Sequence, residues 1–267
     1  MNKQQLIENI RQRKSFLCVG LDTDIQKIPA FLLQAEDPVF EFNRRIIDAT
    51  RNYCVAYKLN TAFYEALGAD GWRIMHKTFH YIGKSHFTIA DAKRGDIGNT
   101  CDMYAHAFFE QMQCNSITLA PYMGRDSVDP FLKYPGKFSI VLGLTSNPGA
   151  ADFQYLHTEG NTKLYQQVIL KAAAWGSSEN MMFVAGATRA EWLRNIREII
   201  PDHFLLVPGV GAQGGSLEEV VKYGMNNEVG LLVNSSRAII YASSGEDFDV
   251  RAGEEAYRIQ LQMSKWI

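Results

Sequence analysis

Short apolar runs alternate with amphipathic helical patterns along the whole chain, and this alternation constrains the fold more than any other feature. Repeated strand–helix pairs predict βαβ units and a parallel sheet. Eight pairs in 267 residues match an α/β fold of one closed (β/α)8 TIM barrel, with an open doubly wound sheet as the alternative. The predicted pairs are 15–21 with 39–51, 55–60 with 70–82, 87–92 with 99–112, 116–120 with 127–134, 138–144 with 162–175, 181–185 with 190–199, 204–207 with 217–223, and 230–234 with 253–265.

The composition is that of an ordinary globular protein with enough apolar material for one large core. Hydrophobic residues make up 46% of the chain and charged residues 21%. Because no linker-like segment divides the sequence, we expect residues 1–267 to form a single barrel domain. The stretch 147–161 is the one long connection without clear periodicity, and its length suggests an active-site loop.

Charge and cysteine content narrow the range of partners. A net charge of −2 gives no broad attraction for nucleic acid or an anionic membrane, so a small ligand is favoured. The cysteines Cys18, Cys54, Cys101 and Cys114 are far apart and form no zinc motif. The polar N-terminus and the lack of any apolar run of about 18 residues predict neither an export signal nor a membrane span. We therefore expect a reduced, cytoplasmic protein.

An apolar strand runs directly into charged residues in the stretch 86–100, HFTIADAKRGDIGNT. Side chains alternate along a strand, so Asp91 and Lys93 should project to the same side, about 7 Å apart along the strand, and can share a site. Asp96 lies beyond Gly95, which releases the backbone from strand geometry, so its carboxylate can face a neighbouring subunit. The alternative interpretation is a solvated charge run at the end of the strand.

Polar residues also follow other predicted strands. In a barrel of this type the carboxyl ends of the strands carry the chemistry, whereas the opposite face serves stability. The residues at these ends are Asp22, Lys58, Asn60, Asp91, Lys93, Thr145, Ser146, Gln213, Ser235 and Arg237.

The segments after the last two strands predict a phosphate site. The first, 207–216, reads VPGVGAQGGS, and its glycines let backbone N–H groups approach an anion at the start of the next helix. The second, 233–238, reads VNSSRA and supplies the forked guanidinium of Arg237. Barrels often place phosphate at these two loops. A tight turn without a ligand is the alternative for the first segment read alone.

Together these segments resemble the orotidine 5′-phosphate decarboxylase family over nearly the whole chain. The family's order is kept by VGLD at 19–22, YKLN at 57–60, DAKRGDIGNT at 91–100, LTSNPG at 144–149, PGVGAQGG at 208–215 and NSSR at 234–237. The AKRGD form and the long loop after Pro148 most resemble the longer bacterial subgroup. The chain departs from the family where Asn234 and two serines precede Arg237 in place of a frequent glycine, and in the loop 147–161, which shorter members lack.

The resemblance implies a cofactor-independent carboxy-lyase, without metal, that converts orotidine 5′-phosphate (OMP) to UMP and CO₂ in the last step of pyrimidine nucleotide synthesis. It implies a homodimer in which Asp96, with Ile97 and Thr100, enters the partner's site. Lys58, Asp91, Lys93 and Asp96 match the family's charged tetrad, with Lys93 protonating C6. Asp22 matches the ribose ligand, Ser146 the pyrimidine contact, and Gln213 and Arg237 the phosphate ligands; Asn60, Pro208, Gly209 and Ser236 complete the substrate-binding set.

The chemistry fits these residue types. Loss of CO₂ from C6 leaves an electron pair in the ring plane that no adjacent carbonyl can delocalise, so stabilisation must be electrostatic. A lysine can stabilise the carbanion and then protonate it, whereas an arginine can do only the first. Asp91 beside the substrate carboxylate would repel it by about 4 kcal/mol at 4 Å and an effective dielectric of 20. Because rate enhancements can demand roughly 23 kcal/mol, most of the help must be transition-state stabilisation.

Three rival functions and one structural alternative remain. A sugar-phosphate barrel enzyme with a similar Asp-x-Lys-x-x-Asp strand would bind magnesium, which the cation of Lys58 would repel. A silent barrel that senses UMP would bind without turnover. A Schiff-base aldolase would need a lysine desolvated toward neutrality rather than one between carboxylates. The charges could also form a buried ion-pair network that only fixes the barrel register.

Overall fold

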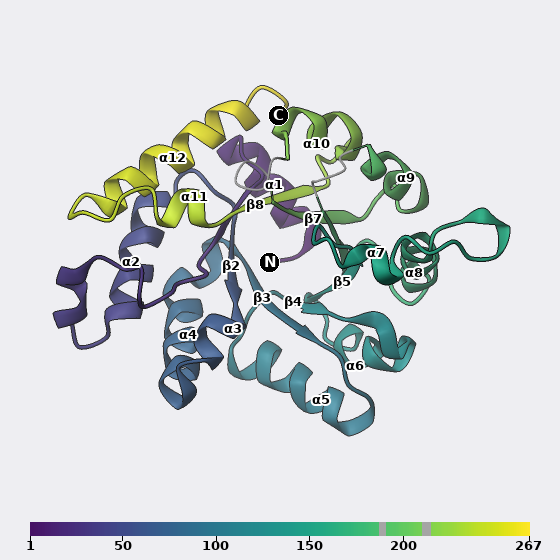
Figure 1. Cartoon of the computed structure of the whole chain (residues 1–267), viewed down its shortest axis with the longest axis horizontal. Helices are drawn as coiled ribbons and strands as arrows, with labels where there is room; N and C mark the ends of the chain where they lie inside the picture. Colours follow the sequence, from purple (N-terminus) through teal and green to yellow (C-terminus); the bar gives the residue numbers. More distant parts are fainter. Residues whose placement is uncertain (187–190, 210–214) are drawn as a thin grey trace.

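The described residues form a closed barrel of eight parallel strands. The computed structural model describes residues 1–186, 191–209 and 215–267 (Figure 1). Each strand pairs with the next in chain order, and β8 pairs with β1, so the barrel prediction is confirmed and the open sheet is wrong. The strands are β1 Leu17–Gly20, β2 Ala56–Asn60, β3 Phe87–Arg94, β4 Ser116–Leu119, β5 Phe138–Leu144, β6 Met181–Ala185, β7 Phe204–Pro208 and β8 Leu231–Ser235.

Helices surround the strands, most of them as an outer ring (Figure 1). They are α1 Lys3–Arg13, α2 Pro38–Thr50, α3 Thr61–Glu65, α4 Gly68–Ile82, α5 Gly98–His106, α6 Asp129–Leu132, α7 Ala150–Phe153, α8 Leu164–Ala173, α9 Trp192–Ile199, α10 Leu217–Gly224, α11 Arg237–Ile240 and α12 Phe248–Met263. Shorter turns are η1 Ala30–Gln34, η2 Gly83–Ser85, η3 Ala107–Gln111, η4 Pro121–Met123, η5 Arg125–Ser127 and η6 Glu159–Asn161. In the described parts of the chain, no helix is long and apolar enough to cross a membrane.

Helix α1 covers the end of the barrel at which the strands begin. Lys3 pairs with Glu228 at 2.7 Å and hydrogen-bonds to Ser178, and the Asn9 amide donates to the Ser85 carbonyl. These partners precede β8, β6 and β3 respectively. The opposite end, where the strands finish, is therefore the end that can admit a ligand.

Two helical predictions differ from the structure, and one helix is not predicted. The pattern at 99–112 becomes α5 followed by the π-helical turn η3, and the one at 127–134 shrinks to α6, which follows two short turns and has Pro130 as its second residue. Helix α3 is not predicted, because its five residues are too short to show a period; the side chain of Asn60 caps its first turn by accepting from the Ala62 N–H at 3.2 Å.

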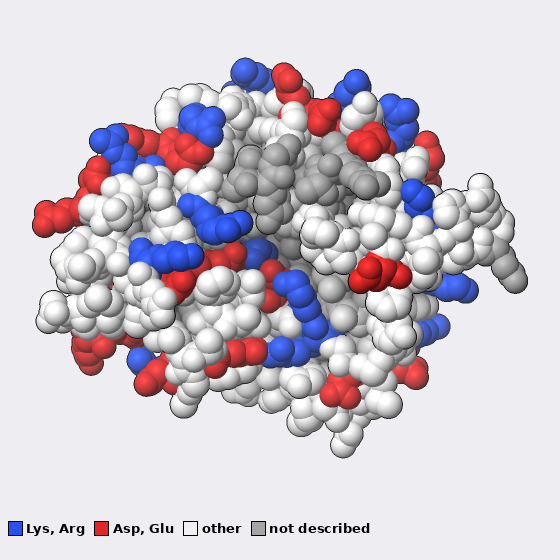
Figure 2. Space-filling view, in the orientation of Figure 1, with Lys and Arg blue, Asp and Glu red and all other residues white. Residues whose placement is uncertain are grey.

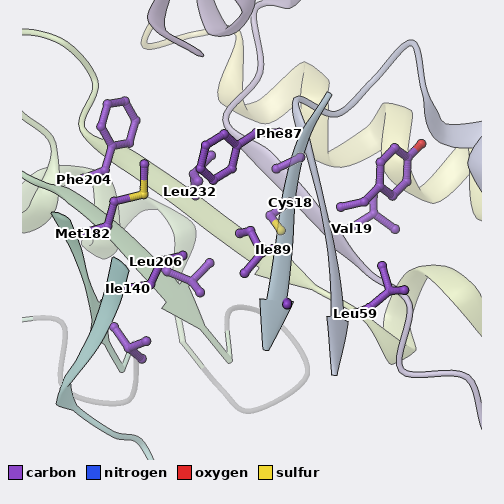
Figure 3. Packing of buried hydrophobic residues seen from close by; sticks show 14 of the residues in the cluster. Cys18, Val19, Leu59, Phe87, Ile89, Ile140, Met182, Phe204, Leu206 and Leu232 are labelled. Carbon is purple, nitrogen blue, oxygen red and sulfur yellow. The ribbon is translucent and has the colours of Figure 1, made fainter. Parts of the chain in front are cut away.

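Strand alternation places one apolar layer inside the barrel and another against the helices. Cys18, Phe87 and Ile89 lie on the inner side, whereas Val19 and Leu59 project to the opposite side (Figure 3). All five side chains are fully buried, as expected for parallel strands covered on both faces. Toward the strand ends the inner positions become charged or polar: Lys58 sits in register with Ile89, and Asn60 with Asp91.

Candidate active site

Charged side chains of both signs meet in a hollow near the centre of the molecule in the view of Figure 2. At the strand ends Lys58 of β2 donates to Asp91 Oδ2 at 3.0 Å and to Asp22 Oδ1 at 3.2 Å. Lys93 of β3 donates to Asp91 Oδ1 at 2.6 Å. Asp91 therefore lies between two lysines, each of which holds a different carboxylate oxygen.

Burial and pairing set the charges of this cluster. The side chains of Lys58 and Asp91 are 6% and 12% exposed, whereas that of Lys93 is 50% exposed. Burial alone would raise the pKa of Asp91, but Lys58 and Lys93 outweigh it and lower that pKa to about 2. Burial alone would lower the pKa of Lys58, but Asp91 and Asp22 outweigh it and hold that pKa above its usual value. Both groups are therefore ionised at neutral pH.

The backbone at Lys93 leaves regular strand geometry. Its φ is +47°, in the left-handed region, and the register between β3 and β4 shifts between Ala90 and Arg94. Asp91 and Lys93 do share one site, as expected, but a bulge brings their charged groups together rather than simple alternation along a strand.

Thr118 of β4 was not among the predicted site residues. Its hydroxyl accepts the Lys93 N–H at 2.9 Å and donates to Asp91 Oδ1 at 2.9 Å, and the residue is fully buried. One side chain thus ties the irregular backbone of Lys93 to the carboxylate that Lys93 contacts. The available signal was a polar residue near the end of a barrel strand.

Asp96, Ile97 and Thr100 lie beyond the end of β3, around the start of α5. Asp96 Oδ1 accepts the Ile97 N–H at 2.8 Å. Within the described residues, no hydrogen bond or ion pair joins Asp96 to Lys58, Asp91 or Lys93. The chain by itself does not bring the fourth member of the predicted tetrad to the other three.

The predicted phosphate residues follow β7 and β8. Pro208 ends β7 and Gly209 follows with φ +88°, while Gln213 lies outside the described residues. Ser236 donates to the Gly20 carbonyl at 3.0 Å, and Arg237 is exposed as the first residue of α11. The Gly20 contact is so close that a Cβ added there would lie 2.7 Å from Ser236 Cβ.

Asn60 and Ser146 lie at the ends of β2 and β5, which stand on either side of β7 and β8 around the barrel. Asn60 ends β2, and its side-chain oxygen is engaged in capping α3. Ser146 follows β5 and is partly exposed. The predicted residues of the described chain thus occupy the ends of β1, β2, β3, β5, β7 and β8, around one mouth of the barrel.

Comparison with known proteins identifies the family. The model of the "Orotidine 5'-phosphate decarboxylase / HUMPS family" matches residues 15–247. Orotidine 5′-phosphate decarboxylase of Flavobacterium johnsoniae is 60% identical over 270 residues, covering 100% of this chain and 98% of the relative. That of Phocaeicola vulgatus is 59% identical over 268 residues, covering 99% and 98%. The solved structure of Leishmania donovani OMP decarboxylase shares 34% identity and a TM-score of 0.80, covering 96% of this chain and 99% of that one. The chain therefore belongs to the orotidine 5′-phosphate decarboxylase / HUMPS family.

Proposed function

We propose that the cluster of Lys58, Asp91 and Lys93 is the place where this protein converts OMP to UMP and CO₂. The observation that carries the proposal is the position of Asp91, held as an anion between a buried lysine at 3.0 Å and a half-exposed lysine at 2.6 Å. This arrangement gives the mouth of the barrel one cation that is fixed and one that can reach a substrate. The whole chain, 1–267, acts as a single catalytic domain.

Lys93 stabilises the developing charge and supplies the proton. The bond between C6 and the carboxylate carbon breaks, its electron pair stays on C6, and neutral CO₂ leaves. The ammonium of Lys93 lies near that pair and then transfers a proton from Nζ to C6, which completes UMP. The half-exposed side chain of Lys93 is compatible with contact to a bound ring.

Lys58 keeps Asp91 charged and in place. Because the pKa of Asp91 is lowered to about 2, its carboxylate stays anionic beside the carboxylate of OMP, and their repulsion disappears when CO₂ departs. The same cation, 3.2 Å from Asp22 and 3.0 Å from Asp91, balances the charge of these two carboxylates, which would otherwise attract a magnesium ion. This geometry favours decarboxylation over a magnesium-dependent reaction of a sugar phosphate.

The remaining residues hold the substrate along the barrel mouth. Asp22 and Asn60 face the ribose, and Ser146 contacts the pyrimidine. Binding energy from the distant phosphate holds the ring against the charged cluster. The proposed phosphate set comprises Pro208, Gly209, Gln213, Ser236 and Arg237.

The active unit is a homodimer in which Asp96, Ile97 and Thr100 reach the partner's site. An exposed apolar group supports this proposal: Ile97 is 53% exposed, Met103 64%, Tyr122 95% and Met123 47%. These residues belong to the segments after β3 and β4, the strands that carry Asp91, Lys93 and Thr118. A second copy of the chain would bury them and could place the missing carboxylate of the tetrad. We place the enzyme in the cytoplasm, with OMP and UMP as ligands and neither nucleic acid nor membrane as a partner.

The direct test follows the ultraviolet absorbance of OMP with purified protein and excess EDTA. Rapid conversion to UMP is expected. If conversion requires added magnesium, the metal-dependent alternative is correct; if UMP binds but OMP is not consumed under either condition, the protein is a silent nucleotide-binding barrel.

A further inference from the structure

The segment 147–161 is a folded projection rather than an unstructured loop. It contains α7 and η6, and its outer part pairs back on the chain through the bridge between His157 and Lys163. The Leu164 N–H donates to the Leu156 carbonyl at 2.8 Å, which closes the pairing. In Figure 1 this part extends away from the barrel beside α8. Its order indicates a structural task.

Gln154, just after α7, clamps the residue that precedes Ser146. The Thr145 N–H donates to Gln154 Oε1 at 2.9 Å, and Gln154 Nε2 donates back to Thr145 Oγ1 at 2.8 Å. Thr145 Oγ1 in turn donates to Asn147 Oδ1 at 2.6 Å. Both the oxygen and the nitrogen of the Gln154 amide therefore hold Thr145, by its backbone N–H and its hydroxyl. Thr145 is one residue from the proposed pyrimidine contact, Ser146.

Aromatic packing fixes the clamp to the barrel. Tyr155, the neighbour of Gln154, packs edge-on against Trp192 of α9 with ring centroids 4.9 Å apart, and Tyr165 of α8 stacks on the same ring at 5.6 Å. Lys163 Nζ lies 3.8 Å from the centroid of Trp192. The projection is thus attached to two helices of the outer ring, so Gln154 has a rigid support.

The opposite side of Ser146 is limited by the end of β6. Gly186 donates its N–H to the Leu144 carbonyl at 2.9 Å, and a Cβ added at Gly186 would lie 2.9 Å from the Ser146 nitrogen and 3.0 Å from its Cβ. Ser146 is therefore confined between the backbone after β6 and the strand end that Gln154 clamps. Loss of the clamp would free it on one side only, toward the projection.

We propose that Gln154 is a positioning residue that sets Ser146 against the pyrimidine ring, and that this is a task of the projection 147–161. The inference rests on the proposed function, because it takes Ser146 as the base contact. It predicts a selective defect. Binding of the base depends on the clamp, whereas binding of the phosphate, at the ends of β7 and β8, does not.

The test measures the dissociation constants of UMP and of ribose 5-phosphate, together with kcat and KM for OMP, in Gln154→Ala. Loss of two neutral hydrogen bonds should weaken UMP binding about tenfold. Ribose 5-phosphate, which lacks the base, should bind as it does to the wild type. Thr145→Val, which keeps its N–H bond to Gln154 and loses the hydroxyl, should give a smaller defect of the same kind and serves as the second variant.

Gln167→Ala is the matched control, because Gln167 of α8 bonds to Thr162, just after the projection, and not to Thr145. It should leave both dissociation constants unchanged. In the double variant Gln154→Ala/Ser146→Ala, the fold-loss in UMP affinity should be smaller than the product of the fold-losses of the two single variants, since Gln154 acts through Ser146. Three results would each overturn the inference. They are equal weakening of UMP and ribose 5-phosphate binding, fold-losses that multiply in the double variant, and an unchanged UMP affinity in Gln154→Ala. If the wild type failed to consume OMP, the proposed function would be overturned instead. The comparison of UMP with ribose 5-phosphate binding would still test the role of Gln154.

Discussion

Lys93 Nζ lies 2.6 Å from Asp91 Oδ1 although only Ala92 separates the two residues, and the backbone of Lys93 has a φ of +47° at this point. A lysine in the left-handed region costs free energy that the surroundings must offset. Here the Lys93 N–H is held by Thr118, whose hydroxyl also donates to the carboxylate that the lysine contacts. The unusual backbone and the charge pair are thus stabilised by one buried side chain.

Thr118→Val tests this coupling. The substitution keeps the shape but removes both hydrogen bonds, so kcat for OMP should fall at least tenfold, with a loss of about 1–3 kcal/mol in the free energy of unfolding. Thr88→Val is the control, since Thr88 bonds to Asn115 rather than to the charged cluster. It should lower stability and leave kcat nearly unchanged. Equal kcat values for the two variants would remove Thr118 from the catalytic arrangement.

Gly20→Ala tests the close approach of β1 to the phosphate end. The new Cβ would lie 2.7 Å from Ser236 Cβ, so Ser236 must move. Overpacking of this size costs about 1–3 kcal/mol, and we expect KM for OMP to rise about tenfold. In Gly20→Ala/Ser236→Gly the contacts with Ser236 Cβ and Oγ are gone and only Asn234 Oδ1, 3.1 Å from the new Cβ, stays tight, so its KM should lie close to that of Ser236→Gly alone. A double variant much worse than Ser236→Gly would show that the contact with Ser236 is not the cause.

The free energy of unfolding should decrease in mild acid because of His86. Burial is the main cause that lowers the pKa of His86 from 6.5 to about 4, and its ring nitrogens contact the Arg51 carbonyl and Ser85 Oγ. The unfolded chain binds the proton first, so the contribution of a neutral His86 is complete above pH 6.5 and is lost as pH falls toward 4, amounting to about 3 kcal/mol.

Urea unfolding from pH 7 to 4 measures this effect. His86→Gln should flatten the pH dependence in part, because the pKa of His203 is also lowered to about 4, chiefly by burial. His80→Gln, at an exposed position of α4, should keep the wild-type slope. An unchanged slope in His86→Gln would contradict the assignment.

Mixing of inactive subunits tests the shared site. Lys93→Ala and Asp96→Ala should each be inactive alone. If Asp96 acts in the partner's site, a mixed dimer contains one intact site, and random mixing should restore about a quarter of wild-type activity. Size-exclusion chromatography of each variant checks that both remain dimeric. If both variants are dimeric and inactive, no gain on mixing would place Asp96 in its own chain's site, whereas an active Asp96→Ala would place it outside catalysis.

The strands could be predicted from the sequence because each one is a short apolar run. The predicted bounds 138–144 and 181–185 match β5 and β6, and the closed barrel follows from the number of units. Lys58, Asp91 and Asp22 could be placed together because the ends of parallel strands meet at one rim. Local sequence patterns are enough to predict an element when the spacing of its apolar residues determines its structure.

Features that depend on tertiary contacts could not be predicted. The left-handed backbone of Lys93 needs Thr118, which is 25 residues away in sequence. The folded projection after β5 is stabilised by Trp192 of α9 rather than by its own periodicity. In our account, the site that Asp96 enters belongs to a second chain. A single sequence indicates only that Gly95 can release the backbone from strand geometry before Asp96.

The central claim, that Lys93 is the acid and the main cation of an OMP decarboxylase, is tested most directly by the turnover of Lys93→Ala. Lys133→Ala, whose amine pairs with Asp102 on the surface, is the control. With UMP binding and the unfolding midpoint checked in both, Lys93→Ala should lose at least about a thousandfold in kcat for OMP, while the control keeps wild-type turnover. A folded Lys93→Ala protein with kcat within tenfold of the wild type would contradict the account.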